Sequence, residues 1–117
     1  MSYLYVFLGG GLGSLCRYLL SKCLPSEEFP WATLSANVLS CIILGVLVAL
    51  VSKNLISAPY RLVLVTGFCG GFSTFSTFSN ECLQFLKSGD YGAAALYVSL
   101  SIIAGLLSLM LGMRFVS

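Results

Sequence analysis

The sequence contains no histidine and very few charges: six Lys or Arg and four Asp or Glu among 117 residues, or 9%. A typical soluble protein carries roughly 25% charged residues, and a small soluble domain leaves much of its surface in water. A chain in which 58% of the residues are hydrophobic could not cover that surface with polar side chains. These scarcities exclude an ordinary soluble domain and indicate an integral membrane protein of one domain, residues 1–117.

Familiar chemical motifs are missing as well. The five cysteines are odd in number and form no CxxC pair, which argues against a thiolate zinc site or a disulfide framework. No nucleotide-binding motif and no pair of acids suited to catalysis occurs. We therefore expect no enzymatic activity, no catalytic residue and no nucleic-acid partner.

Four apolar segments remain, and each is long enough to cross a hydrocarbon core about 30 Å thick. They cover roughly residues 3–23, 31–52, 62–86 and 91–113 and predict an all-α protein with four transmembrane helices. The first segment lacks a basic leading region and carries Arg17 inside its apolar run. We expect it to be a retained span and not a signal peptide. The loop LPSEEFP joins the first two spans.

The basic residues are almost evenly divided between the two sides of the predicted bundle. With four spans, both chain ends and the loop between the second and third spans share one side, which holds Lys53, Arg61 and Arg114. The other side holds Lys22 and Lys87, with Arg17 if it reaches outward. Orientation normally follows an asymmetry in these counts. Its near absence predicts insertion in both orientations and an antiparallel, dual-topology homodimer in the lipid bilayer.

The third span contains the stretch GFCGGFSTFSTFSNE, which combines glycines, hydroxyls and phenyl rings. Gly67, Gly70 and Gly71 lower helix propensity, so we expect the helix to break mid-membrane and to free carbonyl oxygens for a cation. A simple kink is the alternative. Glycines elsewhere, such as the GxxxG pair Gly9 and Gly13, predict close helix packing.

Beyond the glycines lie five hydroxyl residues within residues 73–79, together with Phe75 and Phe78. Hydroxyl and amide groups donate hydrogen bonds, and a phenyl ring offers a positive edge to an anion. Some hydroxyls of a span bond their own backbone, and the rings could be packing bulk. Asn37 in the second span could donate into a pore or join helices.

Other polar groups lie near the expected helix ends or form a stripe. Arg17 attracts anions at a vestibule or only anchors its helix end. Thr33 lies one turn before Asn37 on the same face, and Glu81 is the one acid within any predicted span. Tyr97, Ser101 and Ser108 lie close to one face of the fourth span.

In their order and spacing, these segments resemble the Fluc family of fluoride channels, also called CrcB proteins. The resemblance covers the whole chain and rests on GGGLGSLCRY, TLSANVLSCIILG and GFCGGFSTFSTFSNE. It implies an antiparallel homodimer in the cell inner membrane that lets fluoride leave the cytoplasm through two pores at the dimer interface. It also implies a structural sodium ion at the dimer centre, held by the backbone carbonyls of Gly70 and Ser73.

The resemblance also assigns roles to individual residues. The ion pathway would contain Asn37, Phe75, Phe78, Ser76, Thr77, Tyr97 and Ser101. The vestibule would contain Arg17, Thr33 and Glu81. Two positions depart from the family pattern: Ser73–Thr74 replaces a pair of threonines, and Gly105 stands where the polar track of the fourth span would continue.

Two other functions fit a four-span chain of this length. A proton-coupled multidrug exporter also forms antiparallel dimers, but it needs an acid in the membrane, typically in the first span, and the first span has none. A noncatalytic packing subunit would explain the glycines. It would not explain five hydroxyls beside two phenylalanines and an amide.

Overall fold

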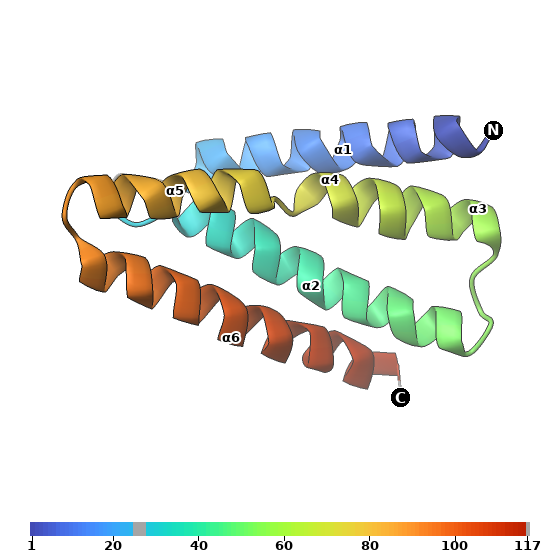
Figure 1. Ribbon diagram of the computed structural model, residues 1–117. Coiled ribbons are helices and arrows are strands. Elements are labelled where there is room, and N and C mark those ends of the chain that lie inside the picture. Colours follow the sequence, from blue (N-terminus) through green and yellow to red (C-terminus); the bar gives the residue numbers. More distant parts are fainter. Residues whose placement is uncertain (25–27, 117) are drawn as a thin grey trace.

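The computed structural model is built of helices, and it describes residues 1–24 and 28–116 (Figure 1). The elements are α1 Ser2–Cys23, α2 Trp31–Ser52, α3 Ala58–Arg61, η1 Leu62–Cys69, α4 Gly70–Phe72, α5 Phe75–Lys87 and α6 Tyr91–Val116. Residues 25–27 of the predicted loop LPSEEFP lie outside the described residues. η1 is a π-helix, and it follows α3 without a gap.

The prediction of four helices able to cross a membrane is confirmed. Within the described residues, four segments are long and apolar enough: Ser2–Cys23, Trp31–Ser52, Ala58–Lys87 and Tyr91–Val116. The third begins earlier than residue 62 because Pro59 occupies its first turn, where a proline needs no helical hydrogen bond. The fourth continues to Val116 and not only to residue 113.

The helices form two closely packed pairs (Figure 1). α1 lies along η1 and α4, and α2 lies along α6. Both chain ends and the connection from α2 to α3 lie at the same end of the bundle. Lys53 Nζ at that end donates to the Val116 carbonyl at 2.8 Å. The basic residues are therefore distributed between the two ends as the sequence predicts.

Glycine packing holds each pair together. A Cβ atom on Gly9 would collide with the Val63 carbonyl, and one on Gly13 would collide with the Phe68 carbonyl. A Cβ on Gly67 would lie 2.9 Å from Gly9 Cα. α2 and α6 meet in the same manner through Gly45 and Gly112. Small residues thus let the backbones approach closely where no hydrophobic effect drives helices together.

The third membrane segment is interrupted after its glycines and not at them. Gly67, Gly70 and Gly71 all lie within η1 and α4, where they are helical. Ser73 and Thr74 are extended, with ψ of 156° and 125°, before α5 begins at Phe75. α4 packs on α1, whereas α5 packs on α6. The interruption therefore moves the chain from one helix pair to the other.

The close contacts of the α1 glycines, which we call a glycine seam, predict that alanine at Gly13 and alanine at Gly11 have different effects on stability. Gly13→Ala should lower the free energy of unfolding by about 1–3 kcal/mol, the usual cost of overpacking, because the new methyl group meets backbone that cannot rotate away. Gly11→Ala should leave stability unchanged or slightly higher, because nothing lies within 4 Å of its Cβ position. Thermal unfolding of the purified protein in detergent measures both, and equal effects would contradict the close packing.

Candidate functional site

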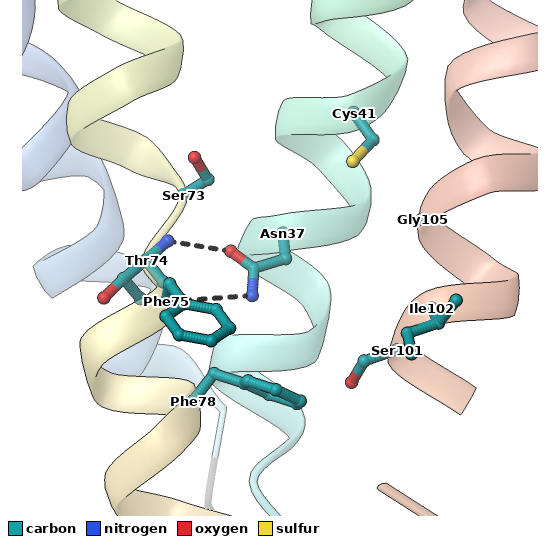
Figure 2. A pocket seen from close by; sticks show the side chains of 9 residues that line it. All are labelled: Asn37, Cys41, Ser73, Thr74, Phe75, Phe78, Ser101, Ile102 and Gly105. Atoms are coloured by element: carbon teal, nitrogen blue, oxygen red, sulfur yellow. Dashed lines mark hydrogen bonds between the residues drawn. The ribbon is translucent and has the colours of Figure 1, made fainter. Parts of the chain in front are cut away.

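A pocket of about 310 Å³ lies between α2, the extended Ser73–Thr74 segment and α6 (Figure 2). It is lined by Asn37, Cys41, Ser73, Thr74, Phe75, Phe78, Ser101, Ile102 and Gly105. None of these side chains carries a formal charge at neutral pH. Their polar atoms are one amide, three hydroxyls and one thiol. We call this space the neutral pocket.

A row of polar side chains on α2 connects this helix to the third membrane segment. Thr33, Asn37 and Ser40 are four and three residues apart and so lie on one face of the helix. Thr33 Oγ1 donates to Glu81 Oε2 at 3.0 Å, and Ser40 Oγ donates to the Cys69 carbonyl at 3.2 Å. Together with Asn37, they pair α2 with three successive levels of the third segment.

Asn37 makes the central connection of this row. Its Oδ1 accepts from the Thr74 N–H at 2.9 Å, and its Nδ2 donates to the Thr74 carbonyl at 3.4 Å (Figure 2). An amide nitrogen carries two donors, and only one of them binds Thr74. The side chain therefore joins the two helices and still lines the neutral pocket, so the two roles predicted for it are compatible.

Ser101 on α6 lies on the other side of the pocket. Its hydroxyl oxygen points toward Phe78 and the Asn37 side (Figure 2). This oxygen is buried, and it has no hydrogen-bond partner among the described residues. A buried hydroxyl without a partner costs free energy, so it favours an occupant of the pocket that can exchange hydrogen bonds with it.

The two predicted phenylalanines lie together on the first turn of α5. The Phe75 and Phe78 ring centroids are 5.9 Å apart, and both rings line the neutral pocket. Phe78 is half-buried and packs on the Tyr97 ring at 4.9 Å. Phe75 is 79% exposed in the single chain, a large exposure for an aromatic ring.

Glu81 is held by two hydroxyl groups. Thr33 binds one of its carboxyl oxygens, and the Tyr97 hydroxyl donates to Oε1 at 2.9 Å. Tyr97 is fully buried, and the rings of Phe29, Phe78 and Phe85 surround it. Tyr97 therefore does not line the neutral pocket. It lies between that pocket and Glu81.

A second pocket, of about 230 Å³, contains the other predicted vestibule residues. Arg17 and Thr33 both line it, as does Thr77, which the sequence places in the ion pathway. Because Thr33 also binds Glu81, the three predicted vestibule residues form one neighbourhood. The second pocket therefore places a fixed positive charge beside neutral hydroxyls.

The hydroxyls of residues 73–79 have different environments. Ser73 Oγ donates to the Cys69 carbonyl at 2.8 Å, the local bond expected of a hydroxyl within a span. Thr74 Oγ1 caps α5 by accepting from the Thr77 N–H at 3.2 Å, and it lies 3.4 Å from Ser76 Oγ. Ser73, Thr74 and Ser76 therefore have local partners, and the Thr77 side chain lines the second pocket.

Three lining residues, Cys41, Thr74 and Ile102, were not assigned to a site from the sequence. Thr74 contributes through its backbone, which no local pattern reveals. Cys41 lies one turn after Asn37 on α2, and Gly105 lies one turn after Ser101 on α6. A Cβ on Gly105 would lie 3.7 Å from Cys41 Sγ, so the thiol lies opposite the position without a side chain. The four-residue spacing from Asn37 could have indicated that Cys41 lies on the same face of α2.

The fold and the pockets define a small multi-pass membrane protein with uncharged hydrogen-bond donors in its interior. Comparison with known proteins identifies the family. Residues 4–113 match the family described as CrcB-like protein, Camphor Resistance (CrcB), and the chain belongs to it.

Curated relatives cover nearly the whole chain. A protein of Phocaeicola vulgatus named fluoride-specific ion channel FluC is 49% identical over 114 residues, which are 95% of this chain and 94% of that protein. A protein of the same name from Flavobacterium psychrophilum is 41% identical over 113 residues, covering 93% and 91% of the two chains. One from Gloeothece citriformis is 40% identical over 120 residues, covering 99% and 97%.

The neutral pocket predicts different reactivities for two cysteines. Cys41 lines the pocket, whereas Cys69 is 4% exposed and its thiol lies 3.9 Å from the Ser40 carbonyl. In single-cysteine variants, a small methanethiosulfonate reagent should label Cys41 at least about tenfold faster, because reaction requires access to the thiol. Mass spectrometry of the reconstituted protein measures both rates. Equal rates, or faster labelling of Cys69, would contradict the difference in access between the two thiols.

Proposed function

We propose that this chain is a fluoride-selective ion channel, not an enzyme, through which fluoride leaves the cytoplasm passively and its toxicity is lowered. The observation that carries the proposal is the buried Ser101 hydroxyl, which has no partner among the described residues and faces Asn37 and Phe78 across the neutral pocket. The names of the relatives supply the identity of the ion. The apolar helices support a location in the cell inner membrane.

The lining of the pocket suits passage better than tight binding. An anion loses water when it enters, and this loss is costly unless other donors replace the water. Asn37 has one remaining N–H, Ser101 has its hydroxyl, and Phe78 offers a ring edge. Since no fixed positive charge lines this pocket, the anion is not held too strongly to leave.

The direction of flow follows from acid–base chemistry. Acid outside the cell favours neutral HF, which crosses lipid and dissociates in the cytoplasm. The trapped anion then needs a path outward. Arg17 in the second pocket would attract it, and Thr77 would offer a hydroxyl on the way to the pore.

The complete channel in this proposal is an antiparallel homodimer with two pores at the subunit interface. The even distribution of basic residues supports insertion in both orientations. In this proposal a second subunit would cover the exposed Phe75 ring beside the pocket. The interruption at Ser73–Thr74 would then lie mid-membrane, where irregular backbone must be buried by protein or lined by water.

A structural sodium ion at the dimer centre also belongs to this proposal, and the residues fit it. In a continuous helix the Thr74 N–H would bind the Gly70 carbonyl, but here it binds Asn37. The Thr77 N–H, which would bind the Ser73 carbonyl, goes to Thr74 Oγ1. Neither carbonyl keeps its usual helical donor, and carbonyl oxygens are suitable ligands for sodium. A bound sodium would supply positive charge and join the two interruptions.

The exporter alternative gains no support from the site. Proton coupling needs an acid that can exchange its proton with the transported compound. The carboxylate of Glu81 is bound by Thr33 and Tyr97. Within residues 1–24 and 28–116, no acidic side chain lines the neutral pocket.

Reconstituted protein should release fluoride from liposomes and should not release chloride at a comparable rate. Phe78→Ile should reduce fluoride efflux at least roughly tenfold, since the loss of about 1.4 kcal/mol at a limiting step slows passage tenfold. A fluoride electrode measures the efflux. Equal passage of chloride, or no efflux at all, would overturn the proposal.

Phe115→Ile is a matched control for this substitution. Phe115 is an exposed phenylalanine near the end of α6 and lines neither pocket. Its replacement changes the same side chain by the same amount and should leave efflux unchanged. If both variants lost activity equally, general destabilisation would explain the loss.

Dual topology predicts half-labelling at both ends of the bundle. Cys23 is exposed at the end of α1, and Ser57→Cys would place a thiol in the exposed loop at the opposite end. In single-cysteine variants, an impermeant thiol reagent added to spheroplasts should label about half of each population, because both orientations are present. Full labelling of one site with no labelling of the other would establish a single orientation.

A further inference from the structure

The Asn37 side chain replaces a backbone hydrogen bond of the third membrane segment. Its amide binds both polar backbone groups of Thr74, at 2.9 Å to the N–H and 3.4 Å to the carbonyl (Figure 2). Thr74 is in the extended region, with φ of −150° and ψ of 125°. Away from water, a backbone N–H and carbonyl need hydrogen-bond partners. Without the Asn37 amide, the N–H and carbonyl of Thr74 would therefore favour the hydrogen bonds of a continuous helix. The contact therefore stabilises the interruption.

This contact has a consequence for the Gly70 carbonyl. The Thr74 N–H is the donor that a continuous helix would supply to that oxygen. As long as Asn37 Oδ1 accepts this N–H, the Gly70 carbonyl is free of it. Gly70 is exposed on the single chain, and outside its own helix no described residue lies within 4 Å of its Cβ position.

We propose that Asn37 is a positioning residue for the sodium site: by accepting the Thr74 N–H, it keeps the Gly70 carbonyl available to the cation. The inference rests on the sodium ion of the proposed function and connects that site to the neutral pocket through one side chain. Linkage makes the effect reciprocal, so sodium also stabilises the Asn37–Thr74 contact. The acceptor oxygen of residue 37 is the required group, and the amide N–H is not.

Two substitutions separate these groups. Asn37→Asp keeps an oxygen that accepts the Thr74 N–H, whereas Asn37→Leu has a similar size and no acceptor. Thermal unfolding of the purified protein is measured against sodium concentration, with N-methylglucamine as the replacement cation. The unmodified protein and Asn37→Asp should be stabilised by sodium with similar half-effect concentrations. Asn37→Leu should need at least about tenfold more sodium, or should not respond.

Ser101→Ala is the matched control, because Ser101 lines the same pocket and makes no hydrogen bond to Thr74. It should keep the sodium response of the unmodified protein even though fluoride efflux falls. An unchanged half-effect concentration in Asn37→Leu would overturn the inference and leave the proposed channel intact. If sodium did not stabilise the unmodified protein, the sodium site itself would fail, and the inference with it.

Hydrogen exchange of the unmodified protein gives a second test that does not depend on whether Asn37→Leu folds. Removal of sodium should speed exchange of the Thr74 amide at least about threefold relative to amides in the middle of α6. An unchanged Thr74 amide, in a protein whose unfolding responds to sodium, would contradict the link between Asn37 and the cation.

Discussion

The pairing of the Asn37 amide with both backbone groups of Thr74 is the contact on which the rest of the site depends. In hydrocarbon, a backbone group without a partner costs several kcal/mol, so a helix can be interrupted only where something else satisfies the freed groups. Asn37 does this for Thr74. The interruption in turn lets α5 leave α1 and pack on α6. Phe78 can then line the pocket, and Glu81 can reach Thr33 and Tyr97.

Two kinds of contact stabilise the helix bundle. Glycine seams lock α1 to η1 and α4, and α2 to α6, by close backbone contact. Hydrogen bonds from the α2 row of Thr33, Asn37 and Ser40 then connect the two pairs. Dispersion depends steeply on distance, so the glycine seams fix how close the helices lie. Hydrogen bonds depend on direction, so the α2 row fixes the register between the helices. The neutral pocket lies where this row meets the interruption.

Sequence patterns predicted the parts of this structure that depend on local composition. Hydropathy located four spans, and the family resemblance grouped Asn37, Phe75, Phe78 and Ser101, which line one pocket in the structure. Glycine content misplaced the interruption, because the glycines serve packing while the interruption depends on Thr74 binding a residue 37 positions earlier. Tyr97 shares a helix face with Ser101, but its hydroxyl reaches Glu81. Such distant pairings have no local signature.

The distribution of used and unused hydrogen-bond donors suits the proposal that one set of residues supports both the structure and the passage of an anion. The hydroxyls of Ser73 and Thr74 and one N–H of Asn37 form hydrogen bonds within the protein. Among the described residues, the buried Ser101 hydroxyl has no partner, and one N–H of Asn37 is not used by Thr74. In the proposed channel, such donors would need little reorganisation when an anion arrives, so they would offset its lost hydration without any fixed charge. A fixed positive charge in the pocket would bind the anion more tightly and slow its departure. Arg17 lines the second pocket and not the neutral pocket, so in the proposed channel it would attract an ion without holding it in the pore.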